Sequence, residues 1–180
     1  MVNNVLLGGI YHRIRLFKIH MSGGRSAAGR GLFKMGVNIS LTMPFEPKPK
    51  LRPRFSVIRG RVHTHTPYAT KEFENRVAAY YMEQAKGYKF EQGVPLAISL
   101  YFGMPVPKSF TKKKCKLIVA GELWHTVKPD CDNLTKSILD ALNEIAWHDD
   151  AQITTLKVQK GYSMDGAYIA LNIREDMGAI

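Results

Sequence analysis

The sequence predicts an α/β (α+β) fold, with a single mixed β-sheet and helices packed on it. About five short segments alternate apolar and polar residues or are continuously apolar, as strands do. Two longer segments repeat apolar residues at helical spacing and lie between the strand-like ones. The length of 180 residues suits one domain, and 45% apolar with 23% charged residues is typical of a chain that buries a core.

The N-terminal part differs in composition from the rest. Residues 1–36 hold six lysines or arginines, no aspartate or glutamate, and seven of the 15 glycines. This density of glycine opposes stable helix or strand, so we expect a flexible basic extension over 1–36 and the folded domain over 37–180. Two alternatives stay open. One is a targeting peptide, although paired glycines would break its amphipathic helix, and the other is a translation start at Met21 or Met35.

The first half of the domain is expected to contain two strands and a helix. Residues 37–43 alternate apolar and polar side chains and predict a half-buried strand. Four prolines between positions 44 and 53 then favour an extended arm that carries basic residues. A second strand is expected at 55–62. Helical spacing of aromatic and aliphatic residues predicts a helix from Thr70, its N-cap, to Gly87.

The second half is expected to contain a buried strand, a helix and two closing strands. The apolar run at 96–102 predicts the strand, and the lysine-rich segment 108–116 is interpreted as a solvated loop. One apolar stripe predicts the helix and consists of Leu134, Ile138, Leu142 and Ile145. Residues 152–158 and 167–173 predict the last two strands.

Charge and motif content exclude several classes of protein. The net charge of +11 and a pI near 9.7 favour a polyanionic partner, with nucleic acid before membrane. No apolar run approaches the roughly 18 residues of a membrane span, and no Gly-rich phosphate loop indicates an NTPase. Two cysteines are too few for a disulfide scaffold, and we therefore expect a reducing, cytoplasmic compartment.

An acidic island interrupts this basic chain. Between positions 130 and 150 six acidic residues, Asp130, Asp132, Asp140, Glu144, Asp149 and Asp150, accompany one basic residue, Lys136. The structural interpretation is that Asp132 or Asn133 caps a helix and that Asp149-Asp150 forms a turn. The functional interpretation is that these carboxylates converge at one sheet edge, if the strand after Asp150 pairs beside the segment leading into Asp130.

Converging carboxylates repel one another unless a cation neutralises them, and few hard oxygen ligands suit Mg²⁺. Lys136 lies one helical turn after Asp132, so it either faces this cluster or forms an ordinary ion pair with Asp132 or Asp140. A metal site with a lysine on a basic protein fits phosphodiester hydrolysis. Asp140 is expected to lie farther from the cluster than the other aspartates.

The same residues resemble a known family. The carrying motifs are Lys-Pro-Asp130-Cys-Asp132-Asn133-Leu134-x-Lys136-x-x-x-Asp140-Ala141-Leu142-Asn143 and Trp147-x-Asp149-Asp150-Ala-Gln152-Ile153. They are similar to those of the RusA family of Holliday-junction resolvases, over roughly residues 37–175. The resemblance implies a RusA-like fold with Asp130, Asp132 and Asp150 as metal-binding catalytic carboxylates, Lys136 as the catalytic lysine, and Asp149 as a less secure ligand.

The resemblance further implies an Mg²⁺-dependent homodimer, with Mn²⁺ as the alternative ion, that resolves four-way DNA junctions by paired symmetric nicks in recombination and repair. Members are often carried by phages and prophages, so the compartment would be the cytoplasm of a bacterium or infected host. A nuclease of forks or flaps and a non-catalytic nucleic-acid-binding module stay open as alternatives.

Two sets of basic residues are expected to bind backbone phosphate, unless they are only solvated charge runs. They are Lys48, Arg52 and Arg54 of the proline-rich arm and Lys112, Lys113 and Lys114 of the expected loop. For the dimer interface the sequence offers only apolar residues in excess of one helix face, such as Phe73, Tyr80 and Tyr81.

Overall fold

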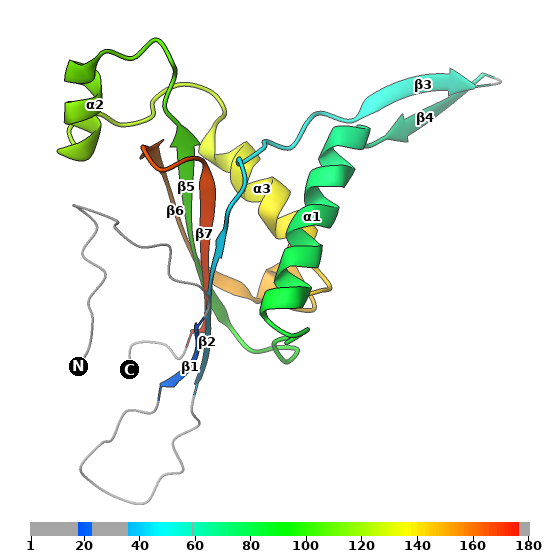
Figure 1. The fold of residues 1–180 in the computed structure, drawn as a ribbon. Coiled ribbons are helices and arrows are strands. Elements are labelled where there is room, and N and C mark those ends of the chain that lie inside the picture. Colours follow the sequence, from blue (N-terminus) through cyan, green and yellow to red (C-terminus); the bar gives the residue numbers. More distant parts are fainter. Residues whose placement is uncertain (1–17, 23–35, 59, 177–180) are drawn as a thin grey trace, which may run out of the picture.

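A computed structural model of the protein describes residues 18–22, 36–58 and 60–176. Its body is a mixed sheet in the order β1-β2-β7-β5-β6, where β5 and β6 are parallel and the other neighbours antiparallel. Helices α1 and α3 pack together on one face of it (Figure 1). The strands are β1 (Lys18–Ser22), β2 (Gly36–Met43), β5 (Leu96–Pro105), β6 (Ile153–Ser163) and β7 (Tyr168–Glu175). The predicted fold class is confirmed.

Strand β1 lies inside the segment in which glycine density predicts no regular structure. It pairs antiparallel with β2, from Lys18 opposite Ser40 to Ser22 opposite Gly36, and so adds a fifth strand to the edge of the sheet. Residues 1–17 and 23–35 lie outside the described residues. The boundary between a basic extension and the folded domain therefore stays a prediction.

The core lies between the apolar strand face and the apolar helix stripe that the sequence predicts. Alternate residues of β2, among them Ile39 and Leu41, are buried beneath helices α1 (Tyr68–Gln84) and α3 (Cys131–Leu142). From α3 the buried stripe is Leu134, Ile138 and Leu142, as predicted, whereas Ile145 follows the helix and is half-buried. Burying apolar side chains of this size stabilises the fold by roughly 1.5–3 kcal/mol each.

The aromatic residues of α1 pack in this core or bind the helix to the sheet. Phe73 and Tyr81 are buried, and the Tyr81 hydroxyl donates to the Tyr88 carbonyl at 2.8 Å. Burial raises the pKa of Tyr81 above its ordinary value of 10.0. The Tyr80 hydroxyl donates to the Thr42 carbonyl at 2.8 Å, which ties α1 to the sheet. The suggestion that these aromatics form a dimer interface is therefore wrong for Phe73 and Tyr81, which the core covers, and stays a prediction for the half-buried Tyr80.

The strand expected at 55–62 is a hairpin instead. Strands β3 (Arg54–Ile58) and β4 (Arg61–His65) pair antiparallel around Gly60, whose φ of +72° suits glycine. The hairpin projects from the body beyond the start of α1 (Figure 1). That helix begins after Pro67, two residues before the predicted region, and the hydroxyl of Thr70 accepts from the Leu51 amide at 3.4 Å rather than capping the helix.

The segment expected to be a solvated loop at 108–116 contains the start of a helix. Helix α2 (Lys112–Val119) is capped by Thr111, whose side chain accepts from the Lys114 amide at 3.4 Å. Lysine has good helix propensity, but a lysine-rich first turn opposes the helix dipole, which is why composition favoured a loop. No helix in the described part of the chain is both long and apolar enough to cross a membrane.

Candidate active site

The first predicted site residues lie where α3 begins. Asp130 is the N-cap residue, with extended backbone, and Asp132 lies exposed in the first turn. The Asp130 side chain makes no capping hydrogen bond. Negative charge is favourable at a helix N-terminus, so both carboxylates are tolerated there while they remain available to a ligand. The interpretation of Asp132 or Asn133 as the cap is wrong.

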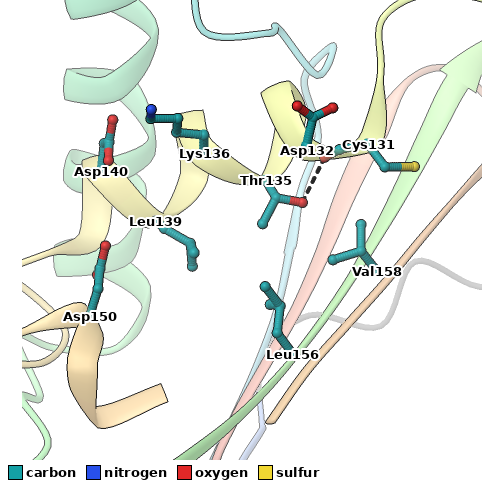
Figure 2. A pocket seen from close by; sticks show the side chains of 9 residues that line it. All are labelled: Cys131, Asp132, Thr135, Lys136, Leu139, Asp140, Asp150, Leu156 and Val158. Atoms are coloured by element: carbon teal, nitrogen blue, oxygen red, sulfur yellow. Dashed lines mark hydrogen bonds between the residues drawn. The ribbon is translucent and has the colours of Figure 1, made fainter. Parts of the chain in front are cut away.

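A cavity of about 400 Å³ brings three predicted residues together. Asp132 and Lys136 reach it from α3, and Asp150 reaches it from the short 3-10 helix η1 (Asp150–Gln152) (Figure 2). Leu139 of α3 and Leu156 and Val158 of β6 supply its apolar wall. The cavity thus combines acidic and basic groups from two elements beside apolar side chains.

The elements converge by a different route from the one expected. Residues 121–130 are a loop rather than a strand, and β6, which follows η1, pairs with β5. Asp150 and Asp132 line the same cavity because α3 packs over β6 and η1 precedes that strand, and Figure 2 shows the two carboxylates at opposite ends of it. Asp130 lies two residues before Asp132 but is not part of the cavity lining.

Asp150 is held by a buried indole. The Trp147 side chain is fully buried, and its Nε1 donates to Asp150 Oδ1 at 2.8 Å. This bond orients the carboxylate and leaves its second oxygen for another partner. The Trp-x-x-Asp spacing therefore carries a positioning function that the sequence pattern alone did not reveal.

Asp149 has a structural task in the same turn. Its Oδ1 accepts from the Ala151 amide at 2.7 Å, and the Gln152 side chain completes a capping box. Gln152 Nε2 also donates to the Glu91 and Val94 carbonyls at 2.8 and 3.1 Å, which fixes the turn to the segment before β5. Asp149 lies outside the cavity lining, and its function as a metal ligand stays a prediction.

Asp140 also lines the cavity, so the expectation that it lies apart is wrong. Its carboxylate forms an ion pair with Lys50 of the proline-rich arm, and Lys50 Nζ also lies 3.2 Å from Glu74 Oε1 of α1. Among the described residues Lys136 has neither of the ion pairs considered above. Lys50 thus neutralises Asp140 and leaves Lys136 exposed beside the cavity.

The donor set suits a hard cation, although the ligands are not gathered. Asp130, Asp132 and Asp150 offer the carboxylate oxygens that Mg²⁺ prefers. Across the described ranges, no three His, Cys, Asp or Glu side chains lie in an arrangement that could hold a metal ion. The residue types therefore fit, and the carboxylates would have to close on the ion as it binds.

A lysine that no sequence motif marks anchors the loop before Asp130. Lys160 of β6 donates from Nζ to the Val127 and Pro129 carbonyls at 2.7 and 2.6 Å. His125, at the start of the same loop, is buried against the Tyr162 ring. Burial, and then the charge of Lys160, lower the pKa of the His125 imidazole. These contacts join residues about thirty positions apart, which no local pattern could show.

Comparison with known proteins places this geometry in context. The family model of the endodeoxyribonuclease RusA matches residues 44–174, about three quarters of the chain. The chain belongs to the RusA endodeoxyribonuclease family. It is also 37% identical to the uncharacterized protein YqaN of Bacillus subtilis (strain 168) over 125 residues, which are 69% of this chain and 88% of YqaN.

Membership in the RusA family implies a nuclease, so the positions of the expected DNA-binding residues matter. Lys48 and Arg52 are exposed on the proline-rich arm, and Arg54 is the first residue of β3. Lys112, Lys113 and Lys114 are exposed on the first turn of α2. Lys48, Arg52 and the three lysines of α2 do not belong to the cavity lining.

Proposed function

We propose that this RusA-family protein is a metal-dependent endonuclease that resolves four-way DNA junctions by paired symmetric nicks in recombination and repair. The observation that supports the proposal is that Asp132, Lys136 and Asp150, from elements separated in sequence, line one cavity. The family assignment supports nuclease chemistry, and the net charge of +11 supports a polyanionic substrate.

Asp130, Asp132 and Asp150 would hold the ion, for which Mg²⁺ or Mn²⁺ is the suitable type. When bound, such an ion lowers the pKa of a coordinated water and polarises the scissile phosphate. Trp147 keeps Asp150 in one orientation by its hydrogen bond, which reduces the reorganisation needed when the carboxylates close. Lys160 holds the backbone just before Asp130 in the same way.

Lys136 would offset negative charge that develops on the phosphate or on the leaving oxygen. It is suited to this because it is exposed at the cavity and unpaired among the described residues. The lysine triplet of α2 and the proline-rich arm would collect the phosphate backbone outside the cavity, where carboxylates do not repel it.

We also propose a homodimer as the active form. The two strands cut in a junction have like polarity and symmetric positions, so a two-fold axis would supply two equivalent active sites. Light scattering at micromolar concentration measures this directly. A mass near the 20.3 kDa of one chain, with junction cutting intact, would defeat the dimer.

One assay tests the activity. An end-labelled four-way junction, a fork and a duplex are incubated with the protein and Mg²⁺, and Asp132→Asn and Asp165→Asn are compared with the parent. Asp165 lies exposed in the turn after β6 and controls for loss of a surface carboxylate. We expect paired nicks in the junction from the parent and from Asp165→Asn alone. Cutting of the fork only would favour the fork nuclease, and no cutting would favour a binding module.

A further inference from the structure

The β3–β4 hairpin presents an apolar face that the body of the protein leaves uncovered. Phe55, Val57 and Val62 are 72%, 70% and 68% exposed. Val57 is paired with Val62, and Phe55 with Thr64, so these side chains share one face of the two-stranded ribbon. Among the described residues no helix or sheet strand packs extensively on it. Isolated two-stranded hairpins are marginal in water, which indicates that this face has a partner.

The opposite face and the surrounding chain are basic. Ser56 is paired with His63, and Arg61 and His63 are exposed on β4. Between positions 47 and 71 the sequence holds seven lysines or arginines and no aspartate or glutamate. A ribbon of this charge is complementary to a phosphate backbone and repels a second copy of itself.

The root of the hairpin is fixed to the helix that carries the candidate catalytic residues. The Lys50 amide donates to the Asn133 carbonyl at 3.0 Å, and Ser137 Oγ donates to the Lys48 carbonyl at 2.7 Å. The ion pair of Lys50 with Asp140 adds a side-chain link. Figure 1 shows the hairpin and α2 extending in different directions from the end of the molecule at which α3 begins. Whatever the hairpin holds is therefore positioned relative to Asp130 and Asp132.

We propose that the β3–β4 hairpin is a DNA-binding arm whose Phe55 face contacts unstacked bases at a branch point while Arg61 follows the backbone. The proposal rests on the branched-DNA substrate proposed above. Each strand of five residues is about 17 Å long, and a two-stranded ribbon of this kind fits a DNA groove. Exposed apolar side chains stack on or wedge between bases where pairing is interrupted.

A second copy of the chain is the competing occupant, and the observations disfavour it. Three side chains expose roughly a few hundred Å² at most, less than the ≈ 800 Å² per partner of a stable interface. Two such arms would also bring two positively charged ribbons close together, with no acidic residue between positions 47 and 71 to offset their charge. Charge complementarity therefore favours DNA over protein.

The test measures binding without cutting, in Ca²⁺ or EDTA. We expect Phe55→Ala to bind a four-way junction about tenfold more weakly and an intact duplex at most about twofold more weakly, since lost stacking affects unpaired bases. Phe55→Tyr keeps a ring and should bind as the parent does. Met82→Ala is the matched control, because Met82 is 48% exposed near the other end of α1. Arg61→Gln should reduce the salt slope by about one on both DNAs.

Three outcomes are distinct. If Phe55→Ala bound the junction as tightly as the parent, the proposal that the hairpin is a DNA-binding arm would be wrong. A dimeric parent that becomes monomeric with Phe55→Ala in light scattering would overturn it too, and would assign the face to a second copy. A parent that binds the junction but does not cut it would defeat the proposed function while the binding difference still supported the arm.

Discussion

Hydrogen bonds of 2.8 Å or shorter hold Asp150, through Trp147, and the loop before Asp130, through Lys160, whereas Phe55 on the hairpin is 72% exposed. The polar cavity side chains arise from α3, which packs on the sheet, and from η1, whereas the arm extends beyond the sheet. Chemistry needs groups held to within about half an ångström, while binding a long polyanion needs charge and reach. The comparison predicts that variants at the cavity change the cutting rate and that variants on the basic arms change affinity.

The largest effect is expected at the carboxylates. Asp130→Asn, Asp132→Asn and Asp150→Asn should each lower cutting on the order of 10³-fold or more, because loss of a ligand charge removes several kcal/mol of metal-assisted stabilisation. Junction affinity should be unchanged or tighter, since one source of repulsion toward phosphate is lost. Gel shifts in Ca²⁺ beside cleavage in Mg²⁺ measure both quantities. If binding and cutting were lost in proportion, the expected difference between the cavity and the basic arms would be wrong.

Lys136→Ala should follow, with cutting about 10²-fold slower and folding nearly unchanged. The charge is proposed to act on the transition state, where a lost donor typically costs that much in rate. Stability should change little because Lys136 is exposed and has no ion pair among the described residues. Single-turnover rates and thermal unfolding on the same samples measure the two effects. Equal rates for variant and parent would remove Lys136 from the chemistry.

Lys160→Met should slow cutting about tenfold without weakening junction binding by more than about twofold. Methionine keeps the straight chain but leaves the Val127 and Pro129 carbonyls without their donor, at about 1–3 kcal/mol of stability. The loop before Asp130 should then loosen. Lys160→Arg, which can still donate, should recover much of the rate. A Lys160→Met variant with full rate but lower stability would limit this lysine to folding.

How far the sequence predicted the molecule depends on the range of the interactions involved. Alternation in β2 and the stripe on α3 are local patterns with direct packing consequences, and both were confirmed. The hairpin was missed because a single glycine, Gly60, turns what reads as one strand into two. Helix α2 was missed because its lysines hide a helix propensity that the Thr111 cap completes.

The site shows the same limit. The carboxylates and Lys136 follow from a short motif, and three of them meet in the cavity. The partners of the site do not follow from it, because Lys50 reaches Asp140 and Lys160 reaches Pro129 only through the tertiary fold. Sequence patterns thus select candidate groups for the chemistry and leave open which groups hold them.

Outside the cavity, removing the charges of the three α2 lysines should change the affinity for the junction and leave the cutting rate unchanged. The combined change of Lys112, Lys113 and Lys114 to glutamine removes three cations and should flatten the salt dependence of junction binding by up to about three units of slope. Cutting of the bound junction should proceed at the parent rate. Glutamine at Lys86 and Lys89, which are exposed and lie outside both basic regions, is the control. An unchanged slope would assign the α2 lysines to solubility.

The smallest expected effect concerns pH and the loop beside the cavity. Burial, and then Lys160, lower the pKa of His125 from its ordinary value of 6.5, so the unfolded chain takes up this proton at higher pH than the folded protein does. The contribution of neutral His125 to stability is therefore complete above pH 6.5 and declines as the pH falls from there toward the lowered pKa. Urea unfolding between pH 7.5 and about 5 should show this decline for the parent and for His148→Gln, whose histidine is exposed. His125→Gln should lose part of the decline, and Lys160→Met should make the decline smaller, because without the repelling charge the folded-state pKa of His125 lies closer to its ordinary value. If His125→Gln and the parent lost stability equally over this range, His125 would not be the group that titrates, and the loop beside the cavity would not be the source of the pH dependence.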